Sequence, residues 1–129
     1  SRLDRGTATR FIEMLDPRWT PEDGDRAGLG NGSVWGCLAQ AVWALRRWSG
    51  YADVVANVVD LGKDTDTVAC VAGAIAGARD GMRTIPTRWA GPLHGTLATP
   101  EGDERHDLTT LTVLAHALIG QGSGEPHQG

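Results

Sequence analysis

The sequence has few cysteines, no excess of basic charge and no long apolar run, and each of these shortages excludes a class of protein. Cys37 and Cys70 show neither a CxxC spacing nor a histidine at metal-ligand spacing, so we predict no disulfide framework, no zinc site and a reducing, cytoplasmic location. Twelve Lys and Arg residues against sixteen Asp and Glu give a formal charge of -4, so nucleic acid is not an expected partner. The longest uncharged apolar stretch, residues 68–78, is shorter than the roughly 20 residues of a membrane-spanning helix, so no membrane partner is expected.

The first 33 residues predict one short helix followed by a long loop. Apolar residues behind Thr7, a residue type that caps helices, indicate a helix that must end before Pro17. Residues 17–32 contain two prolines and four glycines among charged residues, a composition typical of a loop. Within this loop we predict that Asp23 and Asp25 are solvated.

Apolar positions that recur every three or four residues predict four further helices. These cover residues 34–48, about 53–59, 68–78 and 108–119, the last with Asp107 as its N-cap. Gly73 and Gly77 lie on one face of the third of these helices, where another backbone is expected to approach closely. We predict a solvated loop around residues 103–105 and a disordered tail over residues 120–129.

Two of the predicted helices, at residues 34–48 and 68–78, are apolar on nearly every face. Such helices are buried in folded proteins, and too few amphipathic helices remain in the chain to surround them. We therefore expect further protein to cover the remaining apolar surface, supplied by another segment, a second chain or a second copy.

Asp64, Asp66 and Thr67 place two carboxylates and a hydroxyl where a loop enters the glycine-rich helix. Hard oxygen ligands of this kind suit magnesium, which completes its coordination shell with water or substrate oxygens. The same residue types also cap helices and interact favourably with the helix dipole without any metal, and from these residues alone capping is the favoured interpretation. An EF-hand calcium loop is excluded, because it would require an oxygen ligand at Val68 and glycine at Ala69.

Four motifs occur in a characteristic order: LGNG at residues 29–32, LGKDTDT at 61–67, AGAIAGA at 72–78 and IPTRW at 85–89. Together they resemble the C-terminal part of ADP-ribosylglycohydrolases. The resemblance implies an all-α fold, with an N-terminal helix and loop over residues 1–28, a C-terminal helical region over 29–119 and the tail beyond.

The resemblance also implies a site and a reaction. Asp64, Asp66 and Thr67 would be ligands of two magnesium ions, and Asn31, Gly32 and Ser33 would lie against ADP-ribose, where glycine permits close backbone approach. The reaction would be hydrolysis of the glycosidic bond between ADP-ribose and an acceptor. From the residues alone, Ser33 is at least as well explained as the N-cap of the helix that begins at Val34.

The remaining metal ligands and the proposed acid of this family belong to an N-terminal portion that has no counterpart in this sequence. We assign no catalytic residue to the chain. The expected partners are an ADP-ribosylated substrate and the N-terminal half of the same protein or a second chain, without which the chain would be inactive. The alternative is a catalytically inactive relative that acts as a scaffold or as an ADP-ribose-binding module.

Overall fold

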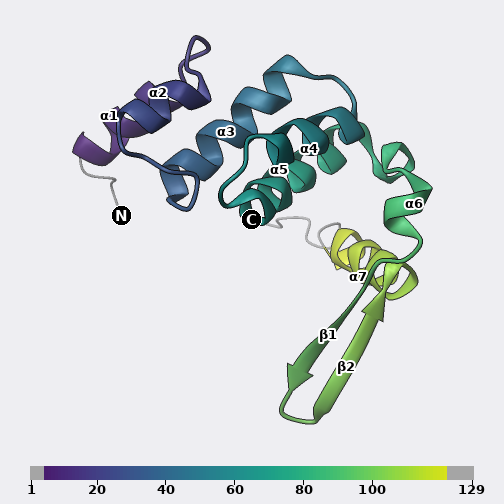
Figure 1. Ribbon diagram of the computed structural model, residues 1–129. Coiled ribbons are helices and arrows are strands. Elements are labelled where there is room, and N and C mark those ends of the chain that lie inside the picture. Colours follow the sequence, from purple (N-terminus) through teal and green to yellow (C-terminus); the bar gives the residue numbers. More distant parts are fainter. Residues whose placement is uncertain (1–4, 122–129) are drawn as a thin grey trace, which may run out of the picture. The chain divides into compact units, whose positions relative to one another are not determined.

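The computed structural model describes residues 5–121, which divide into two compact units. The first unit runs to Ile85 and holds α1 (Arg5–Met14), α2 (Pro21–Arg26), α3 (Val34–Arg47), α4 (Tyr51–Asp60), α5 (Thr65–Asp80) and a 3-10 turn, η1 (Met82–Thr84). The second unit begins at Pro86 and holds α6 (Thr87–Ala90), β1 (His94–Thr99), β2 (Gly102–Asp107) and α7 (Leu108–Gln121) (Figure 1). The chain is mainly helical, as predicted. None of the helices within residues 5–121 is long and apolar enough to span a membrane.

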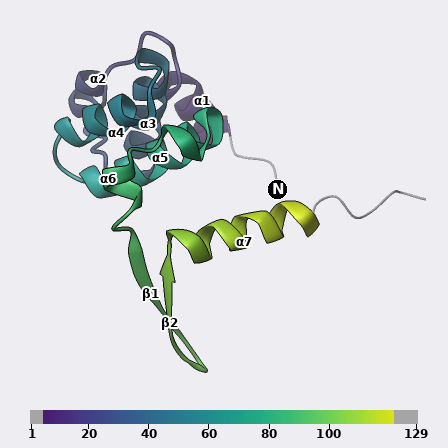
Figure 2. The same cartoon turned by 90° about the vertical axis from the view of Figure 1, so that its right-hand side faces the viewer.

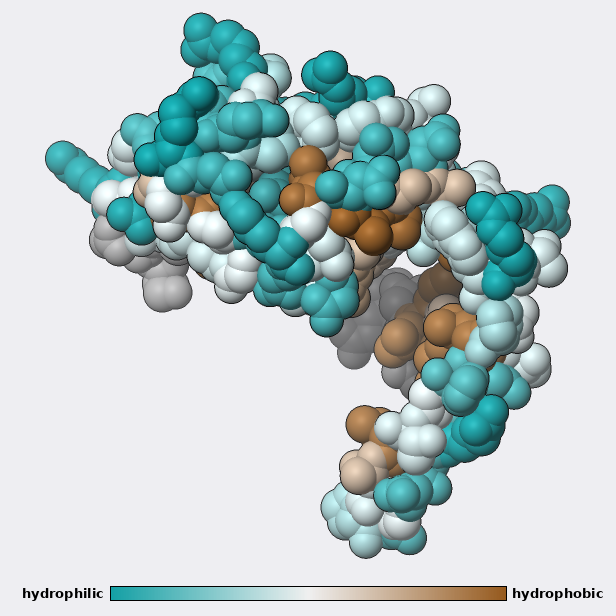
Figure 3. All heavy atoms as spheres, in the orientation of Figure 1, coloured by the Kyte–Doolittle hydropathy of each residue, from teal (hydrophilic) through white to brown (hydrophobic). Residues whose placement is uncertain are grey.

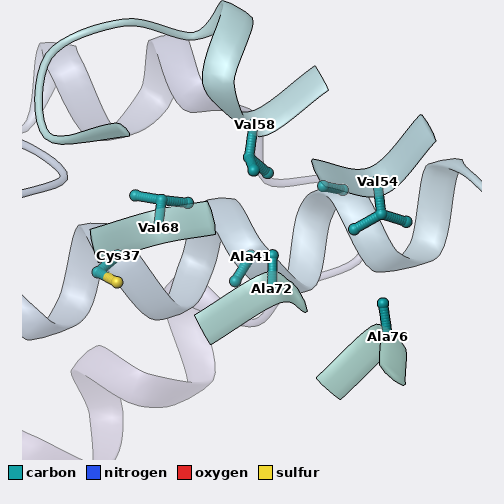
Figure 4. Close-up of a cluster of buried hydrophobic side chains, with 8 residues drawn as sticks. Cys37, Ala41, Val54, Val58, Val68, Ala72 and Ala76 are labelled. Atoms are coloured by element: carbon teal, nitrogen blue, oxygen red, sulfur yellow. The ribbon is translucent and has the colours of Figure 1, made fainter. Parts of the chain in front are cut away.

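Small apolar side chains form the core of the first unit, between α3, α4 and α5. Cys37 and Ala41 from α3, Val68 and Ala72 from α5 and Val58 from α4 belong to one buried cluster (Figure 4). Because alanine and valine project little from a helix surface, the three backbones can pack closely. Burial also raises the pKa of the Cys37 thiol, with further contributions from nearby Asp64 and Cys70, so this cysteine remains an uncharged core residue.

Glycines on α5 and α3 leave space that other groups fill: a side chain at α5 and a backbone carbonyl at α3. On α5, a Cβ at Gly73 would lie 3.2 Å from the Tyr51 hydroxyl, and one at Gly77 would lie 3.7 Å from the same ring. The close backbone approach predicted for these two glycines is therefore wrong, because a side chain of α4 occupies the space. Backbone contact occurs instead at Gly36 of α3, where a Cβ would lie 2.4 Å from the carbonyl oxygen of Gly30.

The segment predicted to be one long loop contains a short helix, α2. The Asp23 carboxylate accepts hydrogen bonds from the Thr20 N–H at 2.8 Å and from the Thr20 hydroxyl at 3.0 Å, and Pro21 occupies the first helical position. This capping arrangement starts the helix despite the surrounding glycines. Asp23 is therefore a partly buried capping residue and not a solvated loop residue, so that prediction was wrong. Asp25 is exposed to solvent, as predicted, although it lies in α2 and forms an ion pair with Lys63.

The second unit contains an antiparallel hairpin where a solvated loop was predicted. β1 and β2 pair from His94 opposite Asp107 to Thr99 opposite Gly102, and the hairpin leads directly into α7 (Figure 2). Residues 103–105 are exposed although they lie in a strand. With both faces in solvent, the strands carry no apolar alternation that sequence could reveal.

The last helix begins at the predicted N-cap but continues past the predicted end. The Asp107 carboxylate accepts the Thr110 N–H at 2.9 Å, which confirms the predicted N-cap. Helix α7 continues through Gln121, so residues 120 and 121 are helical and the rest of the predicted tail lies outside the described residues. Its apolar side chains remain uncovered, with Leu118 73% exposed and Ile119 70% exposed. Apolar surface is visible on both units (Figure 3).

Candidate functional site

The candidate site forms where the loop before α3 meets the loop between α4 and α5. Asn31 joins the two loops and is only 1% exposed. Its side-chain amide donates a hydrogen bond to the Gly62 carbonyl at 2.9 Å, and its side-chain oxygen accepts the Asp64 N–H at 3.2 Å. Two segments that lie about thirty residues apart in sequence are thereby held together, and the LGNG and LGKDTDT motifs become parts of one site.

The loop that carries the carboxylates turns through two residues with positive φ angles. Gly62 has φ 75° and Lys63 has φ 65°, a left-handed conformation that costs a non-glycine residue about 1–2 kcal/mol. The Lys63 ammonium forms an ion pair with the Asp25 carboxylate of α2. This pairing balances a positive charge that would otherwise oppose cation binding beside Asp64.

The three predicted metal ligands lie at the beginning of α5. Asp64 occupies the N-cap position, and Asp66 and Thr67 follow in the first turn. The Thr67 hydroxyl lowers the pKa of Asp64 most, the Asp66 carboxyl and the Thr67 N–H lower it further, and burial acts in the opposite direction. Thr67 is thus close enough to stabilise the charged carboxylate. Within the described residues the Asp64 side chain makes no regular capping hydrogen bond.

The predicted substrate loop lies directly beside this cluster. A Cβ at Gly32 would lie 3.5 Å from Asp64 Oδ2, and Gly32 itself is exposed. Ser33 caps α3, as the simpler interpretation predicted: its hydroxyl donates to the Gly30 carbonyl at 2.7 Å and accepts the Gly36 N–H at 3.1 Å. The hydroxyl of Ser33 is therefore already used in the fold, and a contact with ADP-ribose by this loop remains a prediction.

The chemistry of the donor set fits a hard divalent cation only in part. Two carboxylates and one hydroxyl offer oxygen ligands of the type that magnesium prefers. Within residues 5–121, however, no three His, Cys, Asp or Glu side chains are grouped so that they could hold a metal ion by themselves. Among the described residues, Asp64, Asp66 and Thr67 could therefore supply only part of a coordination shell, and a metal bound here would need further ligands from elsewhere.

Sequence reasoning missed how the site is assembled. Asn31 was predicted to face the substrate, whereas both polar ends of its side chain bind the backbone of the neighbouring loop. The Lys63–Asp25 ion pair was not foreseen either. The GNG motif singles out the asparagine, but no local signal identifies partners that lie more than thirty residues away in the chain.

Comparison with known proteins identifies the class to which this fold and site belong. The family model described as ADP-ribosylglycohydrolase matches residues 2–126. The chain therefore belongs to the ADP-ribosylglycohydrolase family. No solved structure matches the chain.

Several relatives share parts of this sequence. ADP-ribosylhydrolase ARH3 of Danio rerio is 36% identical over 95 residues, which cover 70% of this chain and 24% of the relative. ADP-ribosylarginine hydrolase Tri1 of Serratia proteamaculans is 36% identical over 63 residues, covering 49% of this chain and 17% of that protein. ADP-ribosylhydrolase ARH3 of Bos taurus is 51% identical over 37 residues, which cover 29% of this chain and 10% of that protein. The chain spans at most about a quarter of the length of each of these relatives.

Proposed function

We propose that this chain forms one side of the active site of an ADP-ribosyl hydrolase, in which water replaces the acceptor at the glycosidic bond of ADP-ribose. The observation that carries the proposal is the junction at Asn31, which holds the Gly32 loop against the carboxylate of Asp64. A sugar-nucleotide substrate and a cation could be bound side by side at such a junction. Family membership and the names of the relatives point to the same reaction class.

In this proposal Asp64, Asp66 and Thr67 hold magnesium, with two ions in the complete site. Divalent ions held by these residues would help to orient the ribose hydroxyls and would supply positive charge close to the bond that breaks. The other ligands would come from the N-terminal half of the same protein or from a second chain. The Thr67 hydroxyl lowers the pKa of Asp64, which favours the charged carboxylate that a metal ligand requires.

The residues around Gly32 would bind the diphosphate part of the substrate. An exposed glycine lets a ligand approach the backbone closely, and the following helix, α3, is 14 residues long with its N-terminus at this loop. The partial positive charge of a helix N-terminus favours phosphate groups. Ser33 would act by fixing this helix start through its two hydrogen bonds, which leave its hydroxyl little capacity for the ligand.

The binding step can be tested by calorimetric titration with ADP-ribose in the presence and absence of magnesium. Asp66→Ala should abolish the magnesium-dependent heat, since it removes a proposed ligand from an exposed position without cutting into the core. Asp60→Ala is a suitable control, because Asp60 is also exposed but lies at the end of α4. Unchanged binding in Asp66→Ala would refute the ligand assignment.

Catalysis can be tested by measuring ADP-ribose release in the complete protein, with an arginine-linked substrate as the first probe because one relative is named for that activity. We expect release that depends on magnesium and is lost in Asp66→Ala. Tight, magnesium-dependent binding of ADP-ribose without release from arginine-linked or other acceptors would instead support the inactive scaffold or binding module.

A further inference from the structure

A cavity in the first unit lies apart from the proposed active site. Its volume is about 350 Å³, and it opens between the loop that joins α1 to α2 and the C-terminal half of α3. Helices α1 and α2 lie along α3 on this side of the unit (Figure 1). Residues 30–33 and 62–67 take no part in its lining. The cavity therefore requires an explanation separate from the proposed hydrolase site.

The walls of this cavity carry an excess of positive charge, although the chain as a whole is negative. Arg18, Arg46 and Arg47 face a single carboxylate, that of Asp16. Arg18 neutralises this carboxylate through two hydrogen bonds of 3.1 Å, from Nε to Oδ1 and from Nη2 to Oδ2. The guanidinium groups of Arg46 and Arg47 are left as surplus charge.

Arg46 is also held in position by the fold. Its Nη1 donates to the Leu15 carbonyl at 2.9 Å, which anchors the guanidinium at the cavity wall while its other N–H groups stay available. A planar, anchored guanidinium loses little conformational entropy on binding an anion and can donate two parallel hydrogen bonds to it.

Two indole rings complete the lining. Trp43 lies beneath Arg47, whose guanidinium carbon is 5.7 Å from the ring centroid. Trp19 is fixed against Gly24, where a Cβ would come within 2.9 Å of its ring. Both rings are half-buried and line the same cavity. Ordered indole rings beside guanidinium groups offer stacking surfaces to a planar, electron-rich ligand.

We propose that this cavity binds a nucleoside monophosphate, with the base against Trp19 and Trp43 and the phosphate between Arg46 and Arg47. A phosphate monoester carries a charge of about -1.5 to -2 at neutral pH, which the two surplus guanidinium groups match. The volume lies at the lower end of the roughly 300–1,000 Å³ range of small-molecule pockets. It therefore suits a mononucleotide better than a dinucleotide-sized molecule such as ADP-ribose.

The test uses adenosine monophosphate as the probe, titrated calorimetrically into the protein without magnesium. Arg47→Gln and Trp43→Leu should each weaken binding by at least about tenfold, since each removes one of the two recognition elements. Arg88→Gln is the matched control: Arg88 lies 5.2 Å from the centroid of Trp89 in the second unit, a similar pair that takes no part in lining the cavity. Adenosine alone and inorganic phosphate alone should both bind more weakly than the intact nucleotide.

A second measurement avoids variants that fail to fold. In the unaltered protein, adenosine monophosphate should slow the reaction of phenylglyoxal with Arg46 and Arg47 but not with Arg88, as read by peptide mass spectrometry. The proposal is overturned if neither arginine is protected, or if O-phosphotyrosine binds and the nucleotide does not. It is also overturned if binding survives Arg47→Gln but disappears in Asp64→Ala, because the nucleotide would then occupy the proposed hydrolase site.

Discussion

Replacing Asn31 by alanine tests whether the junction between the two site loops is a structural necessity. The variant removes one hydrogen bond to the Gly62 carbonyl and one from the Asp64 N–H. Each such bond contributes about 0.5–1.5 kcal/mol net, so their loss should cost about 1–3 kcal/mol of the free energy of unfolding. Native domains are stable by only about 5–15 kcal/mol, so the effect should be readily measured.

The assay is urea unfolding followed by tryptophan fluorescence, which reports mainly on the first unit because four of the five tryptophans lie there: Trp19, Trp35, Trp43 and Trp48. Asn57→Ala is the matched control. Among the described residues, the Asn57 amide donates only to the Asp53 carbonyl in its own helix. Alanine favours the helix by about 0.5 kcal/mol, so this variant should differ little from the wild type.

A third variant tests the donating amide of Asn31 separately from its accepting oxygen. Asn31→Asp keeps an oxygen for the Asp64 N–H but turns a second oxygen toward the Gly62 carbonyl and introduces a charge at a buried position. It should therefore destabilise the protein more than Asn31→Ala does. The reasoning is refuted if Asn31→Ala unfolds within about 0.5 kcal/mol of the wild type, or if Asn31→Asp is the more stable of the two variants.

Three further predictions follow from backbone geometry and charge. Gly36→Ala should destabilise the protein by about 2–4 kcal/mol in urea unfolding, because its Cβ would collide with the Gly30 carbonyl. Lys63→Gly should be more stable than Lys63→Ala by about 1 kcal/mol, because both lose the ion pair but only glycine relieves the positive φ. Arg18 lowers the pKa of Asp16 from 3.8 to about 2, chiefly through side-chain hydrogen bonds. The stability gained from Asp16 is thus present above pH 3.8 and is lost as the pH falls through about 2, a dependence that acid unfolding of Asp16→Asn should lack.

Each of these predictions has a matched comparison. Gly77→Ala places its Cβ at an ordinary contact distance from Tyr51 and should leave the protein unchanged or slightly more stable, so similar losses at Gly36 and Gly77 would contradict the argument. Equal stability of the two Lys63 variants would show that the left-handed conformation carries no strain. Arg18→Gln should remove much of the acid-sensitive stability that Asp16→Asn removes, while the hydrogen bond from the N–H of residue 18 to Asp16 remains. An acid-unfolding profile of Arg18→Gln identical to that of the wild type would exclude the ion pair as the cause.

Local sequence signals determined much of the secondary structure. The helix predicted at residues 34–48 corresponds to α3, Val34–Arg47, because apolar periodicity and the Ser33 cap act within a few residues. The Asp107 N-cap of α7 and the end of α5 at Gly81, which has φ 83°, likewise depend on residues that are close together in the sequence. The order of four short motifs was sufficient to indicate the family, which the match over residues 2–126 confirms.

Other features could not be predicted from the sequence, and the reason is physical. Helix α2 was hidden by its glycine and proline content, although the Thr20–Asp23 capping pair starts it. The exposed hairpin has no buried face and hence no alternating pattern. The junction at Asn31, the Lys63–Asp25 ion pair and the arginine-lined cavity join residues about thirty or more positions apart. The sequence by itself determined most of the helices and the oxygen-bearing residues of the candidate site, because those depend on neighbours in sequence, whereas only tertiary packing decided which loops and charges meet.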